Sequence, residues 1–287
     1  MTSAEAEPAP RPFRLNYGFG THRGLRRQLN EDSLVVTGNL FAVADGMGGH
    51  EAGEVASRIC VETLAAGVKE VQDDLTAEDL QRLMVRADEA IRDASGARAG
   101  TTLAGVAIVR EHQGLYWMVF NVGDSRVYRL SEGEFTQVSV DHSEVQELVD
   151  RGHISRDEAQ HHPRRHVITR ALGTGEAPEA DFWMLPVHDG DRLMICSDGL
   201  TTDVDDPQIS QELQDRNSPQ DAVDGLIGLA LRGGGRDNIT VVVVDVEDKD
   251  AESDRSDTSP RDGEERGTTR PREHELPVAG TPQEDQS

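Results

Sequence analysis

Residues 40–49 read Leu-Phe-Ala-Val-Ala-Asp-Gly-Met-Gly-Gly, so five apolar residues run directly into an aspartate. Because both faces of such a run are apolar, it predicts a strand that is buried on both sides. The glycine after the aspartate frees the backbone to turn and lets its carbonyl approach an ion. Apolar runs beside an aspartate recur at residues 118–124, 193–199 and 237–246. If these strands are neighbours in space, their carboxylates meet at one end of the sheets.

Two interpretations of Asp45, Asp124, Asp198 and Asp237 stay open on the residues alone. Aspartate is a common turn residue, and aspartates end strands for that reason alone. Alternatively, like charges gathered in a partly desolvated place are costly, and a hard divalent cation with oxygen ligands compensates for them. We favour the metal interpretation because the pattern repeats. The stretch Arg27-x-x-Asn30-Glu31-Asp32 adds a planar guanidinium that suits two phosphate oxygens, although it is a weak signal by itself.

Strand and helix patterns alternate along the remainder of the chain. Alternating apolar residues between positions 13 and 19 predict a half-buried strand. Further strands are predicted at residues 40–44, 103–109, 115–122, 127–130, 182–187, 193–196 and 239–246. Helices are predicted over residues 52–64 and 80–94, and after Ser143, Ser155 and Ser218. Hairpins near residues 111–114 and 131–133 favour antiparallel pairing. We therefore predict an α+β fold, in which two packed, mostly antiparallel β-sheets form a β-sandwich flanked by helix pairs.

Composition excludes several classes of protein. The chain has 29 Lys and Arg against 54 Asp and Glu, which gives a net charge of 29 − 54 = −25. This charge argues against a nucleic-acid binder, because such affinity comes from clustered basic residues. No apolar run approaches the roughly 18 residues of a membrane span, and residues 1–12 lack the basic and apolar regions of a signal peptide, so we do not expect them to act as one. Cys60 and Cys196 lack metal-ligand spacing and are expected to be core thiols. We expect a cytoplasmic protein without nucleic-acid or membrane partners.

Three regions are predicted along the chain. Residues 1–12 are rich in Pro, Ala and Glu, and residues 247–287 are almost free of apolar side chains. Neither segment can bury enough surface to offset its ordering entropy, so both are predicted to be disordered. Residues 13–246 contain no convincing linker and are predicted to form one domain.

An ordered set of motifs points to a known family. The motifs are Arg27…Asn30-Glu31-Asp32, residues 41–49, Gly100-Thr101-Thr102, residues 122–126, Asp141-His142-Ser143, residues 168–173, residues 196–200 and residues 237–240. As a set, they make residues 13–246 resemble the bacterial metal-dependent protein phosphatases of type 2C. The resemblance implies a β-sandwich flanked by helix pairs, with two Mn²⁺ or Mg²⁺ ions at one end and a weaker third ion.

The resemblance also implies roles for individual residues. Asp45 would bridge both metals, Gly46 would offer its carbonyl to one, Asp198 and Asp237 would bind the other, and Asp124 would help to bind the third. Glu31 would act through metal-bound water, with Asp32 beside it, and Arg27 would hold the phosphate. A stretch of about residues 143–172 matches a mobile flap beside the site.

The activity that follows from the resemblance is hydrolysis of phosphoserine and phosphothreonine in proteins. A metal-activated water would attack phosphorus in line, without a covalent intermediate. We expect a monomer that reverses the action of bacterial Ser/Thr kinases, with phosphorylated proteins as partners. Two alternatives stay open: a catalytically weak, phosphoprotein-binding pseudophosphatase, and a phosphatase of an anti-anti-sigma-type regulator. A metal-dependent nuclease is disfavoured by the net charge of −25.

The sequence departs from the family pattern in two places. Met47 follows Asp45-Gly46, where many eukaryotic members have a histidine proposed as the general acid, and methionine cannot donate a proton. His22 stands where bacterial members usually have an aspartate before the arginine, which is expected to weaken the positioning of Arg27. The histidines between positions 161 and 166 are expected to be flap or solvated residues and not metal ligands.

Overall fold

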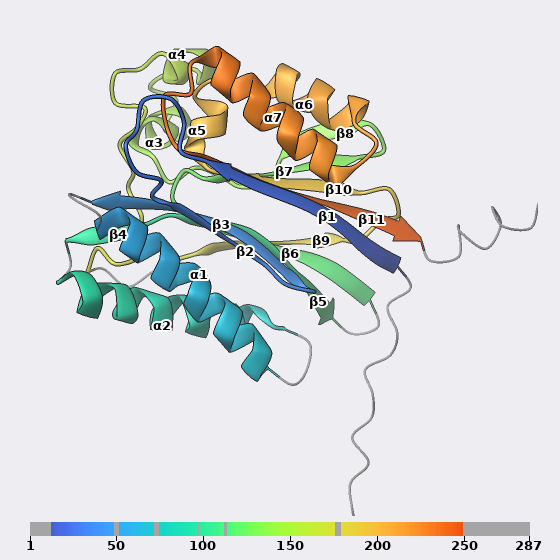
Figure 1. Cartoon of the computed structure of the whole chain (residues 1–287), viewed down its shortest axis with the longest axis horizontal. Coiled ribbons are helices and arrows are strands. Elements are labelled where there is room, and N and C mark those ends of the chain that lie inside the picture. Colours follow the sequence, from blue (N-terminus) through green and yellow to red (C-terminus); the bar gives the residue numbers. More distant parts are fainter. Residues whose placement is uncertain are drawn as a thin grey trace, which may run out of the picture.

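Two antiparallel sheets lie face to face in the computed structural model (Figure 1), which describes residues 13–48, 52–71, 75–96, 98–111, 114–175 and 179–248. The first sheet has the order β1 (Phe13–His22), β11 (Ile239–Asp248), β10 (Arg192–Cys196), β7 (Arg126–Ser131) and β8 (Glu134–Gln137). The second has the order β2 (Asp32–Val36), β3 (Leu40–Gly48), β5 (Leu103–Glu111), β6 (Gly114–Val122) and β9 (Asp181–Pro186), and β4 (Ala99–Thr101) pairs with β3.

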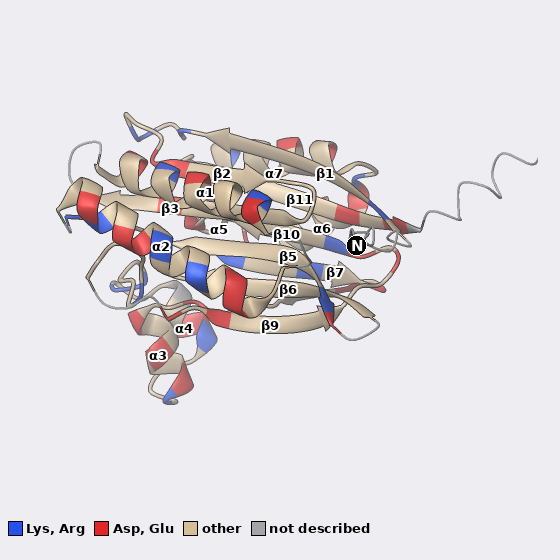
Figure 2. Ribbon diagram, turned by 90° about the horizontal axis from the view of Figure 1, so that it is seen from below, with Lys and Arg blue, Asp and Glu red and all other residues tan. Residues whose placement is uncertain are grey.

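Helices cover the outer faces of both sheets (Figure 1). The second sheet carries α1 (Ala52–Glu70) and α2 (Ala77–Ser95), and the first carries α5 (Asp198–Thr201), α6 (Asp206–Asp215) and α7 (Pro219–Gly233). The short helices α3 (Glu144–Asp150) and α4 (Arg156–Gln160) project from one end of the sandwich (Figure 2). The architecture therefore has four layers, in the order helices, sheet, sheet and helices.

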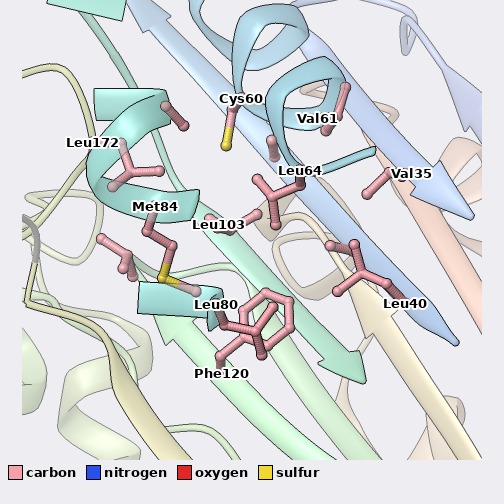
Figure 3. Close-up of a cluster of buried hydrophobic side chains, with 14 of the residues drawn as sticks. Val35, Leu40, Cys60, Val61, Leu64, Leu80, Met84, Leu103, Phe120 and Leu172 are labelled. Atoms are coloured by element: carbon pink, nitrogen blue, oxygen red, sulfur yellow. The ribbon is translucent and has the colours of Figure 1, made fainter. Parts of the chain in front are cut away.

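Strand β3 shows why residues 40–44 are apolar throughout. Phe41 and Val43 point into the core between the two sheets, whereas Leu40, Ala42 and Ala44 point into the core under α1 and α2. Successive side chains of a strand face opposite sides of its sheet, so a sheet that is covered on both sides needs apolar residues at every position. Figure 3 shows the core under α1 and α2, which contains Cys60, Met84 and Leu172.

The edge strand β1 lies against the first turn of α7. A Cβ atom on Gly18 would come within 2.5 Å of the Gln220 backbone, so only glycine permits this approach. The Gln220 side chain accepts a hydrogen bond from the Phe19 backbone N–H at 3.2 Å and donates one to the Phe19 carbonyl at 3.3 Å. The exposed side of β1 is thus bonded at Phe19 by a helix of the outer layer.

The predicted fold class is confirmed, and so are the antiparallel pairing and the predicted helices and strands. Several short elements were not predicted: β2, β4, α5 and α6; β8 is the second strand of the hairpin predicted near residues 131–133. Asp45 lies inside β3 and not beyond its end, because β2 and β4 extend the ladder of β3 past residue 44. Strand β11 continues to Asp248, two residues beyond the predicted end of the domain. Of the segments predicted to be disordered, 1–12 and 247–287, residues 1–12 and 249–287 lie outside the described residues. Among the described helices, none has the length and apolar character to cross a bilayer.

Candidate active site

The sandwich brings the predicted aspartates to one end. Asp45 in β3 lies directly opposite Asp32 in β2, because the β2–β3 register pairs these two residues. Asp124 follows the end of β6, Asp198 begins α5 two residues after β10 ends, and Asp237 lies two residues before β11 begins. Residues that are up to 205 positions apart in the sequence thus share one site.

Electrostatic coupling shows how close these carboxylates are. The pKa of Asp45 is raised well above its usual range, first by burial and then by the negative charges of Asp32, Asp198, Asp124 and Asp237. Each neighbouring carboxylate disfavours ionisation of Asp45, so the ionised cluster needs a compensating positive charge. This arrangement agrees with the metal interpretation of the four aspartates.

Within this cluster, two buried carboxylates have an oxygen with no hydrogen-bond partner among the described residues. Asp32 Oδ2 accepts hydrogen bonds from Ser197 Oγ at 2.8 Å and from Thr240 Oγ1 at 2.7 Å, but Asp32 Oδ1 accepts none. Asp124 Oδ1 likewise accepts no hydrogen bond, and Asp124 is only 7% exposed. Buried polar oxygens normally have a hydrogen-bond partner. These two atoms therefore indicate a ligand that is a cation or donates hydrogen bonds.

The backbone of Asp45 is fixed by Thr101 at the end of β4 and by Thr102, which lies between β4 and β5. Its N–H donates to Thr102 Oγ1 at 3.0 Å, and its carbonyl accepts from the Thr102 N–H at 2.9 Å and from Thr101 Oγ1 at 3.0 Å. Gly46 is equally constrained, because a Cβ atom there would lie 2.0 Å from the Gly53 carbonyl oxygen at the start of α1. The carboxylate of Asp45 therefore projects from a strand whose backbone is held in place.

Arg27 lies at the rim of the carboxylate cluster. Its Nη2 donates to Asp237 Oδ2 at 2.6 Å, and half of its side chain is exposed. The neighbouring Glu31 carboxylate accepts a hydrogen bond from the Gly53 N–H, and burial raises the pKa of Glu31 although the charge of Arg27 opposes the rise. The structure thus places both residues at the site, and it adds an ion pair between Arg27 and Asp237 that was not predicted.

Asn238 anchors the loop that carries Arg27. Its Oδ1 accepts from the Glu31 N–H at 2.8 Å, and its Nδ2 donates to the carbonyls of Arg23 and Leu29, both at 2.9 Å. The loop between β1 and β2 is therefore tied to the residue that precedes β11. Sequence reasoning assigned no role to this side chain.

His22 accepts a backbone hydrogen bond in the turn that leads into the Arg27 loop. Its Nδ1 accepts a hydrogen bond from the Gly24 N–H at 2.9 Å. Gly24 has φ = +78°, and a Cβ atom there would lie 2.1 Å from the Asp237 carbonyl oxygen, so the turn needs glycine. A neutral imidazole nitrogen can thus close the same kind of turn as a carboxylate oxygen.

The flap segment (residues 143–172) is attached to the site at its C-terminal end. The backbones of Thr101 and Leu172 exchange two hydrogen bonds, of 3.0 Å and 2.9 Å, and Leu172 is buried in the core under α1 and α2 (Figure 3). Within this segment, His166 Nδ1 lies 3.7 Å from Asp198 Oδ2, and this carboxylate raises the pKa of His166. Nothing in the sequence distinguished His166 from His161 and His162.

The donor set fits a hard divalent cation. Every candidate ligand is a carboxylate or carbonyl oxygen, the type that Mg²⁺ and Mn²⁺ prefer. Among the described residues, no three His, Cys, Asp or Glu side chains converge closely enough to hold an ion alone. Water and backbone carbonyls would therefore complete the coordination, as is usual for Mg²⁺.

Comparison with known proteins gives the family. Residues 19–226 match the profile of the family described as Protein phosphatase 2C. The chain belongs to the protein phosphatase 2C family. A relative named serine/threonine protein phosphatase PstP, from Mycobacterium tuberculosis, is 43% identical over 248 residues, which cover 82% of this chain and 46% of PstP. This protein phosphatase 2C chain thus spans about half the length of that relative. The serine/threonine phosphatase stp of Listeria welshimeri is 37% identical over 243 residues, covering 79% of this chain and 94% of stp.

Solved structures share the fold of this protein phosphatase 2C chain. The catalytic domain of PstP in complex with two manganese ions superimposes with a TM-score of 0.74 at 38% identity, covering 82% of this chain and 99% of that domain. The phosphatase MsPP of Mycobacterium smegmatis, in complex with cacodylate, gives the same TM-score and identity and covers 80% of this chain and 97% of MsPP. The likeness therefore extends over the whole sandwich.

Proposed function

We propose that this chain is a metal-dependent protein serine/threonine phosphatase. The observation that carries the proposal is the group of carboxylates around Asp45, in which Asp32 and Asp124 each have a buried oxygen without a partner among the described residues. Arg27 adds a cation that suits a phosphate ester at the rim of this group. Membership of the protein phosphatase 2C family supports the proposal, as do two manganese ions in a related catalytic domain.

The carboxylates would hold two ions of Mn²⁺ or Mg²⁺ and a weaker third one. Asp45 would bridge the two tight ions, the Gly46 carbonyl would serve one of them, Asp198 and Asp237 would serve the other, and Asp124 would help to hold the third. When bound, such ions lower the pKa of water and balance charge on phosphoryl oxygens.

The chain's own residues then bind and orient the reactants. The Arg27 guanidinium offers parallel N–H donors to two oxygens of the phosphate, while Asp237 keeps it at the rim. Asp32 Oδ1 is free to accept a hydrogen bond from the attacking water, because Ser197 and Thr240 occupy only its Oδ2. Met47 has no proton to give, so the leaving serine or threonine oxygen must take its proton from another group.

The test is hydrolysis of a phosphothreonine peptide by the purified full-length chain with Mn²⁺. We expect turnover with Mn²⁺, loss of turnover in excess EDTA, and loss of turnover by a factor of about 10³ in Asp45→Asn. The variant Lys69→Glu, in the last turn of α1, is a control for a change of charge outside the carboxylate cluster. Activity that survives EDTA would refute the metal requirement.

The alternative of a pseudophosphatase is an outcome of the same experiment. Tight binding of the phosphopeptide by the Mn²⁺-loaded chain without release of phosphate would identify a binding protein instead of an enzyme. We propose proteins phosphorylated by Ser/Thr kinases as the physiological substrates, and a phosphorylated regulator of the anti-anti-sigma type is the alternative substrate.

A further inference from the structure

Two short segments beside the carboxylate cluster differ in charge from the rest of the chain. Residues 21–29 contain three arginines, residues 161–170 contain three more, and neither segment contains Asp or Glu. Across the chain, 29 of 287 residues are Lys or Arg, and they are outnumbered by 54 Asp and Glu. With 3 of 9 and 3 of 10 residues basic, these cationic segments are about threefold enriched over that average.

Both cationic segments border the site. Arg27 in the first is bonded to Asp237, and His166 in the second lies 3.7 Å from an Asp198 oxygen. Figures 1 and 2 together show that the β1–β2 loop and the helices α3 and α4 occupy the same end of the sandwich, on opposite sides of it. A chain bound across the carboxylates would therefore have a cationic segment on each side.

One arginine in each cationic segment is free to bind a ligand. Four of the six have partners: Arg23 with the Gln28 carbonyl, Arg27 with Asp237, Arg164 with Glu144 and Arg170 with Asp181. Arg26 and Arg165 are exposed, and within the described part of the chain their guanidinium groups have no hydrogen bond or ion pair. An unpaired exposed guanidinium loses no existing contact when it binds a carboxylate.

The same segments expose apolar side chains. Leu25, Leu29 and Val167 are 62%, 42% and 42% exposed, and they are three of the eight large hydrophobic residues that are exposed in the described structure. Arginine is enriched at surfaces that bind polypeptides, and the buried centre of such a surface is more apolar than the rest of it. An inorganic anion could not bury these apolar side chains, whereas a peptide can. The two cationic segments therefore fit a peptide better than an inorganic anion.

Resting on the proposed phosphatase function, we propose that Arg26 and Arg165 select phosphopeptides with acidic residues on both sides of the phosphorylated residue. A peptide carboxylate can pair with two N–H groups of each guanidinium. The remainder of a chain with net charge −25 repels such a peptide, so these two segments determine whether an acidic substrate can approach.

The experiment compares three phosphothreonine peptides of equal length whose flanking residues are Glu, Gln or Lys. The readout is the ratio of kcat/KM for the Glu peptide to kcat/KM for the Lys peptide within one protein preparation, which cancels any loss of folded enzyme. An exposed arginine–carboxylate pair changes binding by about two- to fivefold, so two pairs predict a ratio well above 1 that falls towards 1 in about 0.5 M salt.

Reversing the charge at Arg26 or Arg165 tests whether these two residues cause the preference for the Glu peptide. We expect Arg26→Glu and Arg165→Glu each to lower the ratio by about fivefold, mainly through KM for the Glu peptide, and the double variant to favour the Lys peptide. Lys69→Glu makes the same change of charge in the last turn of α1 and should leave the ratio unaltered.

Equal rates for the three peptides would overturn this inference, and so would a ratio in the double variant that matches that in Lys69→Glu. If the chain hydrolyses none of the three peptides and does not hydrolyse p-nitrophenyl phosphate, the proposed function is contradicted instead. In that case fluorescence anisotropy of the labelled peptides with the Mn²⁺-loaded chain decides the inference: preferential binding of the Glu peptide that depends on Arg26 and Arg165 supports it, and equal binding overturns it.

Discussion

Replacing Asn238 with alanine removes the three hydrogen bonds that tie the β1–β2 loop to the start of β11. Each such bond contributes about 0.5–1.5 kcal/mol net, and water can reach part of the loop, so we expect a loss near the lower end of the sum, about 2 kcal/mol. For a domain of this size, that loss lowers Tm by about 4–8 °C.

Catalysis should fall more than stability alone explains. Arg27 and Glu31 lie on the loop that Asn238 holds, and misplacing a positioned group by about 1 Å can cost up to about 100-fold in rate. We therefore expect kcat/KM for a phosphothreonine peptide to fall by about 10- to 100-fold at a temperature well below Tm. Asn238→Asp keeps the acceptor for the Glu31 N–H but loses both donors, so it should not restore activity.

A matched control separates the two effects. Asn39 lies in the turn between β2 and β3, at the opposite end of that hairpin from the site, and its side chain accepts a hydrogen bond from Thr37 Oγ1. We expect Asn39→Ala to lower Tm slightly without changing the kinetics. The reasoning is wrong if Asn238→Ala lowers Tm as expected while kcat/KM stays within about twofold of that of the unaltered chain.

Four further predictions concern the carboxylate cluster and its arginine. In EDTA, Asp45→Asn should raise Tm above that of the unaltered chain, because burial and its neighbours raise the pKa of the carboxyl that it replaces. The pKa values of Asp32, Asp45 and Asp124 are all raised on folding, so the folded metal-free chain binds more protons than the unfolded chain, and its Tm should fall as pH rises from about 5 to 8; saturating Mn²⁺ should remove most of that slope. Asp124→Asn should keep two tight Mn²⁺ sites in calorimetry and reduce turnover, and loss of all tight binding would make Asp124 a primary ligand. Arg27→Ala should raise KM for a phosphopeptide more than it lowers kcat, with partial recovery in Arg27→Lys, and an unchanged KM would remove Arg27 from the phosphate site.

The long elements could be predicted because burial leaves a local pattern in their sequences. The run at residues 40–44 is apolar at every position because its sheet is covered on both faces. The capping box of Thr76 and Asp79, predicted from their spacing, is present at the start of α2. The sequence pointed to Asp45, Asp124, Asp198 and Asp237 for the same reason, since each lies in or near an apolar strand.

Other elements depend on contacts that no local pattern records. Strand β2 begins with Asp32, a charged residue whose burial results from its pairing with β3 and from the hydroxyl groups of Ser197 and Thr240. Asn238 acts on residues more than 200 positions away in the sequence. Helix α6 is a different case, because Asp205 and Gln208 form a capping box whose signal was present and overlooked.

The contact between the Gln220 side chain of α7 and strand β1 also affects how copies of this chain can associate. Unpaired backbone groups on an edge strand are a template on which another molecule can add its own strand, and this is a common route to aggregation. Because Gln220 already bonds both the N–H and the carbonyl of Phe19, an incoming strand would first have to displace two hydrogen bonds. A single residue of α7 therefore hinders strand addition at the β1 edge of the first sheet. The exposed side chains of Tyr17 and Phe19 would otherwise favour association there.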